Sequence, residues 1–445
     1  MPVPPRLRRS LAAALPAVLA VFFTACSSAG YPNSVFTPFT EFNRDVGHLF
    51  DILIVLGTIV FIFVEAILLY TIWRYRRRSE NDRPEHVHGN TTLEILWTAI
   101  PALILAFIAV PTVRTIFRTQ AKASADALQV EVIGHQWWWE FRYPQYKITT
   151  ANELYLPVGR KVNFTLKSQD VLHSFWIPQL GGKRDLITNH PNYLWFTPDS
   201  VGEQAWNGFC AEFCGASHAN MRFKAFTVTP ANFESWAAHQ ASPAVFGAVA
   251  PAGSAPGAPA AAPAGAGAPP AAPRSGTVAT AASPMNMPGH DMAAMGGATV
   301  QQAGFVAFPR EKVPSYVMPA TPIPPGMTFD ESLKGDAERG RALLGQGAGA
   351  CMGCHTIGGN PMMVGVTGPN LTHVGSRTTI AGGIYPNDTK HLSLWIKNSR
   401  WMKPGVIMPT LGAFQRDPVT GQTVPGTGLT DQQIADIVAY LQALK

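Results

Sequence analysis

Two long apolar segments constrain the fold of this chain more than any other feature of its sequence. They cover residues 52–73 and 93–113, about 21 residues each. At a rise of about 1.5 Å per residue, a helix of that length crosses the roughly 30 Å hydrocarbon core of a bilayer. We therefore predict a two-helix transmembrane hairpin over residues 48–118. This prediction disfavours a purely soluble protein.

The charges around these segments predict their orientation. The short loop between them contains the basic residues Arg74, Arg76, Arg77, Arg78 and Arg83, whereas residues 26–47 contain only Arg44. Because loops rich in Lys and Arg stay in the cytoplasm, both large flanking regions are expected on the outer face of the membrane. The net charge of +6 is explained by this topology, so we expect no nucleic-acid partner.

Two carboxylates lie in or beside the predicted spans. Glu65 is inside the first segment and Glu94 opens the second. A carboxylate at membrane depth is costly and normally faces a protein partner or a proton path, so Glu94 is a candidate for the entry of such a path. The alternative for Glu94 is an interfacial residue in the first helical turn, where a negative charge suits the helix dipole.

The N-terminus carries an export signal. Arg6, Arg8 and Arg9 precede an apolar run at 11–23 that is too short to span a bilayer but fits a signal peptide over residues 1–25. The run ends in Phe-Thr-Ala-Cys, which is similar to a lipoprotein cleavage site and predicts acylation of Cys26; ordinary cleavage is the alternative. Export and two spans indicate the bacterial cytoplasmic membrane.

The remaining chain divides by composition. Short β-type runs at 130–133, 161–166 and 225–228, broken by Pro and Gly turns, predict a small β-sandwich over residues 126–238. Between 241 and 282, 35 of 42 residues are Ala, Pro, Gly or Ser, which predicts a linker over 239–328. Residues 329–445 form a further unit that ends in a helix, because a capping box at Thr430 and Gln433 precedes apolar residues at helical spacing.

Four of the five cysteines lie in two chemical patterns. The first is C-A-E-F-C-G-A-S-H-A-N-M at 210–221, with His173 37 residues upstream of Cys210. Sulfur and imidazole ligands select copper or zinc over hard cations. Two thiolates can bridge two copper ions, each completed by one His and one weaker ligand, either the Met221 thioether or the Glu212 carbonyl. A zinc site is the alternative, but it leaves Met221 without a role because thioethers bind zinc poorly.

This loop resembles the binuclear copper A site of cytochrome c oxidase subunit II. The segments at 92–97 with 100–102, 134–139 and 170–173 resemble the same family, so the likeness covers residues from about 40 to 235. It implies a cupredoxin-like fold for the sandwich and these copper ligands: His173, Cys210, the Glu212 carbonyl, Cys214, His218 and Met221. It further implies that the Glu212 carboxylate reaches a magnesium ion shared with subunit I. Quinol oxidase subunits lack the copper ligands and are disfavoured.

The resemblance also assigns a role to one of three consecutive tryptophans. It implies that Trp137 is an exposed indole through which electrons enter toward copper A. At least one of Trp138 and Trp139 is expected only to pack in the sandwich core, because alternate side chains of a strand face opposite sides.

The second pattern, Cys351-Met-Gly-Cys354-His355, is typical of covalent c-type haem attachment, in which His355 is the proximal ligand. Together with a predicted helix at 335–344 and a Met-Pro pair 53 residues after His355, it resembles an all-α class I cytochrome c over residues 329–445. The sixth ligand is then Met408, with Met402 as the competitor. The same likeness leaves two other histidines of the unit as ordinary surface or loop residues, His373 and His391.

The two resemblances together imply subunit II of a haem-copper oxidase of the caa3 kind. An external donor, a cytochrome c or a cytochrome bc complex, would reduce haem c, which passes electrons to copper A and on to the oxygen-reducing subunit I. The chain is then the electron-transfer subunit of a proton-translocating enzyme, and its linker would let the haem domain dock and leave. The alternatives are a subunit of a copper A nitric oxide reductase and a copper-handling protein, although the latter would not need the haem pattern.

One segment of the predicted linker carries soft ligands. The residues concerned are Met285, Met287, His290, Met292 and Met295. Their spacing suggests a weak Cu(I)-binding segment beside a domain that must acquire copper. A plain Met-containing linker is the alternative.

Overall fold

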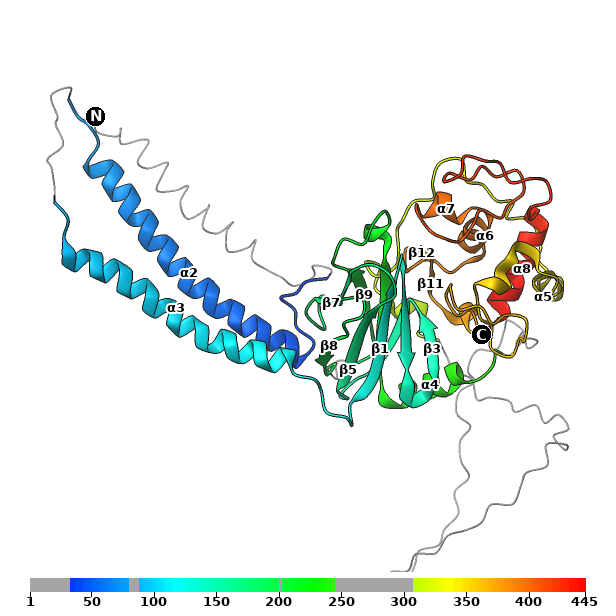
Figure 1. Ribbon diagram of the computed structural model, residues 1–445, viewed down its shortest axis with the longest axis horizontal. Helices are drawn as coiled ribbons and strands as arrows, with labels where there is room; N and C mark the ends of the chain where they lie inside the picture. Colours follow the sequence, from blue (N-terminus) through cyan, green and yellow to red (C-terminus); the bar gives the residue numbers. More distant parts are fainter. Residues whose placement is uncertain (1–32, 80–87, 200–201, 245–306) are drawn as a thin grey trace, which may run out of the picture. The chain divides into compact units, whose positions relative to one another are not determined.

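Figure 1 shows the computed structural model of the chain, which describes residues 33–79, 88–199, 202–244 and 307–445. These described residues all belong to one compact unit. The predicted signal peptide with Cys26 and the methionine-rich segment at 285–295 lie outside the described residues, so these two predictions stay predictions.

The two predicted spans are long helices, α2 (Glu41–Arg74) and α3 (Thr91–Gln120). Each begins at a polar cap: the Thr40 side chain accepts from the Asn43 N–H, and the Asn90 side chain accepts from the Leu93 N–H. Both are long and apolar enough to cross a membrane, and their apolar side chains are exposed. Each helix is longer than its apolar segment, because more polar turns extend it at the end that faces the sandwich.

The base of α2 is joined to the sandwich by side-chain contacts. The Glu41 carboxylate accepts from the Thr197 N–H at 2.9 Å, and the Arg44 guanidinium binds the Asp199 carboxylate at 2.6 Å. These contacts hold the first turn of α2 on the sandwich. The Glu41 carboxylate also complements the positive N-terminal end of the helix dipole.

The predicted β-sandwich is confirmed, and consists of two five-stranded sheets. The first sheet has the order β3 (Ile148–Ala151), β2 (Trp138–Tyr143), β1 (Leu128–His135), β5 (Val162–Ser168) and β8 (Asn192–Phe196). The second has the order β4 (Glu153–Pro157), β10 (Arg222–Val228), β9 (Gln204–Cys210), β6 (His173–Trp176) and β7 (Arg184–Leu186). Only the β1–β5 and β4–β10 pairs are parallel among the paired strands of these sheets.

Aromatic side chains fill the space between the two sheets. Trp139, Phe175 and Phe223 are fully buried, and the rings of Phe175 and Phe223 stack at 5.0 Å. Trp139 belongs to this core, as expected for one of the tryptophans, whereas Trp138 faces the other side of β2. Burying rings of this size removes a large apolar area from water and so stabilises the sandwich.

The chain on both sides of the linker packs on the sandwich. Helix α4 (Pro230–Ala241) follows β10, and residues 307–318, here called the strap, return to the same domain. In the strap, Phe308 packs on Phe226 at 4.8 Å and Val317 is fully buried. The structure therefore differs from the predicted linker bounds of 239–328, because large apolar side chains in the strap gain a buried position.

The unit after the strap is mainly helical. Its helices are α5 (Ala337–Gly345), α6 (Thr389–Lys397), α7 (Ser399–Met402) and α8 (Asp431–Ala443), with two short strands, β11 (Thr379–Ile380) and β12 (Tyr385–Pro386). Single 3-10 turns occur at Pro144–Tyr146, His218–Asn220, Arg310–Lys312 and Val374–Ser376, and a longer, kinked 3-10 segment occurs at Ala348–Gly353. The predicted capping box of Thr430 and Gln433 is confirmed.

A glycine sets the crossing of the first and last helices of this unit. A Cβ on Gly340 of α5 would lie 2.0 Å from the Asp436 carbonyl oxygen of α8, so no larger residue fits without movement. This close approach positions the segment after α5, which carries the C-x-x-C-H pattern, over the helical core.

Candidate functional site

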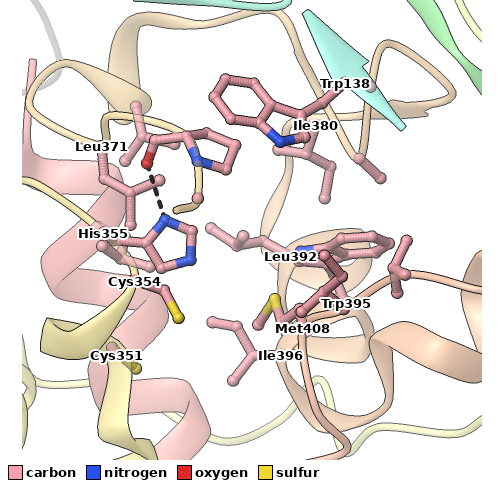
Figure 2. Close-up of a pocket in the computed structure, with 18 of the residues that line it drawn as sticks. Trp138, Cys351, Cys354, His355, Leu371, Ile380, Leu392, Trp395, Ile396 and Met408 are labelled. Carbon is pink, nitrogen blue, oxygen red and sulfur yellow. Dashed lines mark hydrogen bonds between the residues drawn. The ribbon is translucent and has the colours of Figure 1, made fainter. Parts of the chain in front are cut away.

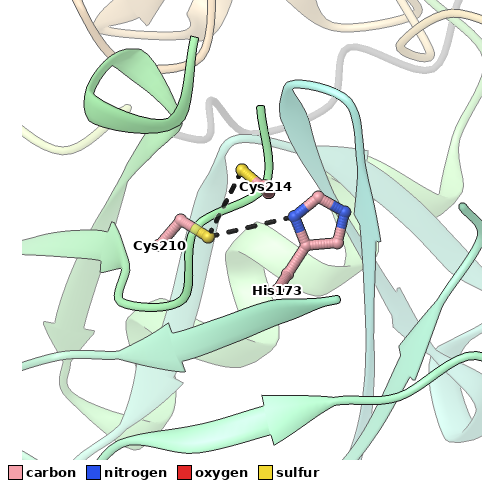
Figure 3. A group of neighbouring side chains, drawn as sticks. All are labelled: His173, Cys210 and Cys214. Carbon is pink, nitrogen blue, oxygen red and sulfur yellow. Dashed lines mark hydrogen bonds between the residues drawn. The ribbon is translucent and has the colours of Figure 1, made fainter. Parts of the chain in front are cut away.

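The first group of predicted ligands comes together at one end of the second sheet. His173 starts β6, and Cys210 ends β9 beside it, because Phe175 of β6 is paired with Cys210. The loop after β9 carries Cys214 back toward the sheet, where the Cys210 N–H donates to the Met221 carbonyl at 3.1 Å. Figure 3 shows His173, Cys210 and Cys214 facing one another.

The distances between the donor atoms fit metal ligation. The sulfurs of Cys210 and Cys214 are 3.7 Å apart, well beyond the roughly 2.05 Å of a disulfide. The His173 Nδ1 lies 3.9 Å from the Cys210 sulfur, and the His218 Nδ1 lies 3.6 Å from the Cys214 sulfur. Two donors bound tetrahedrally to one ion at about 2.0–2.3 Å are separated by distances of this size.

The donors are arranged in two groups around the sulfur pair. The Glu212 carbonyl oxygen lies 3.2 Å from the Cys210 sulfur, on which His173 also converges. The Met221 sulfur lies 3.7 Å from the Cys214 sulfur, beside His218. Two groups of one imidazole and one weaker donor, sharing two sulfurs, suit two soft ions better than one zinc ion, because a single tetrahedral zinc leaves the thioether and the carbonyl unused.

The sequence analysis missed an aspartate that orients one ligand. The Asp170 carboxylate binds the Nε2 of His173 at 2.8 Å, so the Nδ1 of His173 faces the sulfurs. The same carboxylate accepts from the Gln136 N–H at 2.7 Å. Its place three residues before His173 was visible in the sequence, but no local pattern shows that its carboxylate turns back to the imidazole.

The protonation of the sulfur pair follows from its surroundings. A hydrogen bond from the Cys214 thiol, together with the His173 imidazole, lowers the pKa of Cys210 despite its burial. The pKa of Cys214 is raised by its hydrogen bond with Cys210, by burial and by the negative charge of the neighbouring sulfur. The surroundings therefore favour the ionised form of Cys210 over that of Cys214, and a bound cation would favour the loss of both protons.

The second group of predicted ligands surrounds a cavity in the helical unit. Figure 2 shows the sulfur of Cys354, the ring of His355 and the sulfur of Met408 at this cavity, with Cys351 beside them. The rest of the wall is mostly apolar and includes Leu371, Ile380, Leu392, Trp395 and Ile396. An apolar cavity with two thiols and an imidazole suits the attachment of a porphyrin.

The proximal histidine is held in one orientation. The Nδ1 of His355 donates to the Pro369 carbonyl at 2.8 Å, which leaves its Nε2 for a metal. A Cβ on Gly368 would lie 2.6 Å from the Cε1 of His355, so the glycine makes room for the ring. These contacts fit the ligand role that the sequence predicts for His355.

The structure distinguishes the two methionines considered as the sixth ligand. Met408 lines the cavity that contains His355. Met402 is instead 3% exposed and belongs to the apolar core of the unit, and its carbonyl accepts from the Tyr385 hydroxyl at 3.0 Å. This placement favours Met408.

The two remaining histidines differ in environment. His391 lies at the start of α6 and binds the Asp388 carboxylate at 2.8 Å. His373 lies in a loop, as one of the two predicted positions, and is buried there: its Nε2 binds the Ser242 carbonyl at 3.0 Å, and its ring lies 4.4 Å from that of His239. Both have protein partners, so neither competes for the cavity.

Trp137 lies between the two groups of ligands. Its indole N–H donates to the Cys214 carbonyl at 2.9 Å, and its side chain also lines the cavity around His355. The expectation of an exposed indole is wrong, because Trp137 is only 8% exposed. A Cβ on Gly405 of the helical unit would lie 2.7 Å from its six-membered ring, so this unit covers the indole.

The two carboxylates near the membrane are not part of either group. Glu94 is exposed in the first turn of α3, which agrees with its description as an interfacial residue, and Glu65 lies half-buried within α2. The structure brings neither to the sulfur pair nor to the cavity within its described part, so the proton-path hypothesis for Glu94 remains a prediction.

The structure combines two apolar helices, a sandwich with a buried sulfur and imidazole cluster, and a helical unit built around a C-x-x-C-H cavity. This combination defines a class of membrane-anchored electron-transfer proteins. Family descriptions match the three parts separately: cytochrome c oxidase subunit II transmembrane domain at 39–115, its periplasmic domain at 147–228, and cytochrome c at 337–445. The chain belongs to the cytochrome c oxidase subunit II family and carries a C-terminal cytochrome c domain.

Individual relatives agree with this assignment. Cytochrome c oxidase subunit 2 of Alkalihalophilus pseudofirmus is 29% identical over 88% of this chain and 85% of its own length. The subunit of the same name from Thermostichus vulcanus is 32% identical over 43% of this chain and 73% of its own length. Quinol oxidase subunit 2 of Bacillus subtilis is 36% identical over 42% of this chain and 60% of its own length, so identity alone does not identify the donor.

Proposed function

We propose that this chain carries electrons from a covalently bound haem c to a binuclear copper A site and from there to the oxygen-reducing subunit I. The observation that carries the proposal is the position of Trp137, which lines the cavity around His355 and donates to the Cys214 carbonyl at 2.9 Å. One side chain thus lies beside both groups of ligands.

The residues of this chain would hold the groups as follows. His173, Cys210, the Glu212 carbonyl, Cys214, His218 and Met221 would hold the two coppers, while Cys351, Cys354, His355 and Met408 would hold the haem. The bound groups supply one-electron redox chemistry. The protein keeps the ligands in place, because Asp170 orients His173 and Pro369 orients His355.

The loop that bears the sulfurs also presents a surface for subunit I. Phe213 is 74% exposed, and Val171 and Leu172 are exposed on the neighbouring loop before β6. Large exposed apolar side chains beside a redox site are typical of a protein interface. The Glu212 side chain is exposed on the same loop, where we propose that it reaches a magnesium ion shared with subunit I.

The hairpin and the charge of its loop support a location in the bacterial cytoplasmic membrane, with both redox domains on the outer face. There an external cytochrome c or a cytochrome bc complex would supply electrons. The whole complex, rather than this chain, would reduce oxygen and translocate protons.

Metal analysis and spectra of the purified oxidase test the proposal. We expect about two coppers assigned to this chain per haem c and a seven-line paramagnetic resonance signal, because an electron shared by two coppers couples to both nuclei. Cys210→Ser should abolish that signal and stop haem c re-oxidation while the haem c band persists. Zinc in place of copper, or re-oxidation at an unchanged rate in Cys210→Ser, would contradict the proposal.

A further inference from the structure

The cytochrome c domain contacts the sandwich through groups that are buried and hydrogen-bonded. The backbone N–H of Arg222 donates to the Gly382 carbonyl at 3.0 Å, and the Ser217 hydroxyl donates to the Pro404 carbonyl. Gly382 comes so close that a Cβ on it would lie 3.1 Å from the Trp137 carbonyl oxygen. Close-packed, hydrogen-bonded contact of this kind occurs in the well-packed core of stable interfaces.

A buried carboxylate of the sandwich binds the cytochrome c domain at one end of this contact. Glu153 of β4 is only 3% exposed. Its Oε1 accepts from the Thr378 N–H at 2.7 Å, from the Thr378 hydroxyl at 2.6 Å and from the Thr379 N–H at 3.2 Å. Without the cytochrome c domain this carboxylate would lose three donors, and without Glu153 the two backbone N–H groups would lose their acceptor.

A buried lysine of the cytochrome c domain binds the sandwich at the other end. Lys403 is 1% exposed, and its ammonium donates to the Trp137 carbonyl at 2.7 Å and to the Ala381 carbonyl at 2.9 Å. A buried lysine is rare unless its donors are satisfied, and one of its two acceptors belongs to the sandwich. The same segment places Gly405 against the Trp137 ring.

The strap shortens the connection between the two domains. Lys224 donates to the Val317 carbonyl, and the Asn207 amide donates to the Tyr316 carbonyl at 3.0 Å, so the strap is held on β9 and β10. Residues 307–318 are therefore attached to the sandwich before the chain enters the cytochrome c domain. The chain that connects the strap to the cytochrome c domain is therefore residues 319–336, which is shorter than the whole linker.

From these contacts we propose that the cytochrome c domain is seated permanently on the sandwich over Trp137, held by Glu153 and Lys403. This surface, here called the seat, is occupied by the chain's own domain and closes Trp137 to soluble electron donors. External electrons then enter only through haem c. The inference rests on the proposed function for its electron path, but the seat itself is defined by protein contacts alone.

Cleavage between the strap and the cytochrome c domain in the intact oxidase tests the seat. A protease site is inserted between Pro319 and Ala320, so that the haem c fragment no longer carries the strap, and the purified complex is cut and passed over a size-exclusion column in detergent at high dilution. We expect the haem c fragment to remain with the complex. Transfer from haem c to copper A should keep its rate within about twofold and remain independent of protein concentration, because the seat and not the linker holds the domain.

Substitutions in the cut complex test the named residues. Glu153→Ala is expected to weaken retention of the fragment by about 100-fold, because it leaves buried backbone donors unpaired. Glu153→Gln retains an acceptor and should restore retention to within about tenfold of wild type. Glu234→Ala removes an exposed carboxylate of α4 that binds the Tyr146 hydroxyl, and serves as the matched control without effect.

The outcomes separate the seat from the electron path. Release of the fragment on cutting the wild-type complex, or a transfer rate that falls in proportion to dilution, would overturn the seat. Equal retention in Glu153→Ala and wild type would remove Glu153 from it. A fragment that stays bound but fails to reduce copper A supports the seat and contradicts the proposed electron path instead.

Discussion

Replacing Asp170 by Asn tests whether the copper site depends on a residue that holds no metal. The substitution keeps the size of the side chain but removes the negative charge that faces the Nε2 of His173 at 2.8 Å. A charge-assisted bond of this length makes the imidazole a stronger ligand and fixes its ring. Loss of such a partner lowers metal affinity by about 10–100-fold, which corresponds to about 1.4–2.8 kcal/mol.

The assay is a chelator titration of the purified oxidase, followed by the copper A paramagnetic resonance signal. We expect Asp170→Asn to lose copper at a chelator concentration about 10–100-fold below that of wild type. Asp126→Asn makes the same change at an exposed carboxylate that binds Ser124, and should leave the titration unchanged. A wild-type titration curve for Asp170→Asn would refute the argument that this carboxylate strengthens the ligand.

Three further predictions concern the cytochrome c domain and the strap. Gly368→Ala places a Cβ 2.6 Å from the His355 ring and should reduce the yield of holoprotein with a six-coordinate haem spectrum, whereas normal yield and spectrum would show that the ring can shift. Met408→Leu should abolish the methionine-ligated spectrum and lower the reduction potential, while Met402→Leu, in the core, should preserve both; the reverse pattern would exchange their roles. Burial lowers the pKa of Lys224 from 10.5 to about 8, so the unfolded state binds the extra proton between these values and stability rises with pH there. The free energy of unfolding of wild type, measured by thermal unfolding relative to Lys224→Met, should therefore rise by up to about 3 kcal/mol between pH 7 and 11. A difference between the two proteins that does not change with pH would contradict a buried amine.

The burial of Trp137 changes the interpretation of the linker. A long Ala- and Pro-rich segment predicts a domain that docks and leaves, since flexible chains of this length reach far. The structure places the strap on the sandwich and the Gly405 backbone on the indole. Sequence composition describes the linker correctly as poor in large apolar residues, but it does not show where the chain becomes anchored again.

The proposed copper ligands illustrate how far the sequence could be taken. Cys210, Cys214, His218 and Met221 lie within twelve residues, so one loop is sufficient to bring them together. His173 lies on a different strand, and only the family resemblance indicated its place before the pairing of β6 with β9 was seen. The spacing of ligands in one loop is local information, whereas strand pairing is not.

The sequence by itself predicted the two long apolar helices and the C-terminal helix with its capping box, which the structure contains, and it also predicted the orientation of the spans and the chemistry of both sites. These follow from apolar length, charge placement and ligand spacing, which depend on residues near one another in the chain. Only the tertiary structure decided that Asp170 orients His173, that Met408 rather than Met402 lines the cavity, and that Glu153 and Lys403 join the two domains. Each of these contacts depends on backbone paths distant in sequence, and side-chain type alone does not specify which groups such paths bring together.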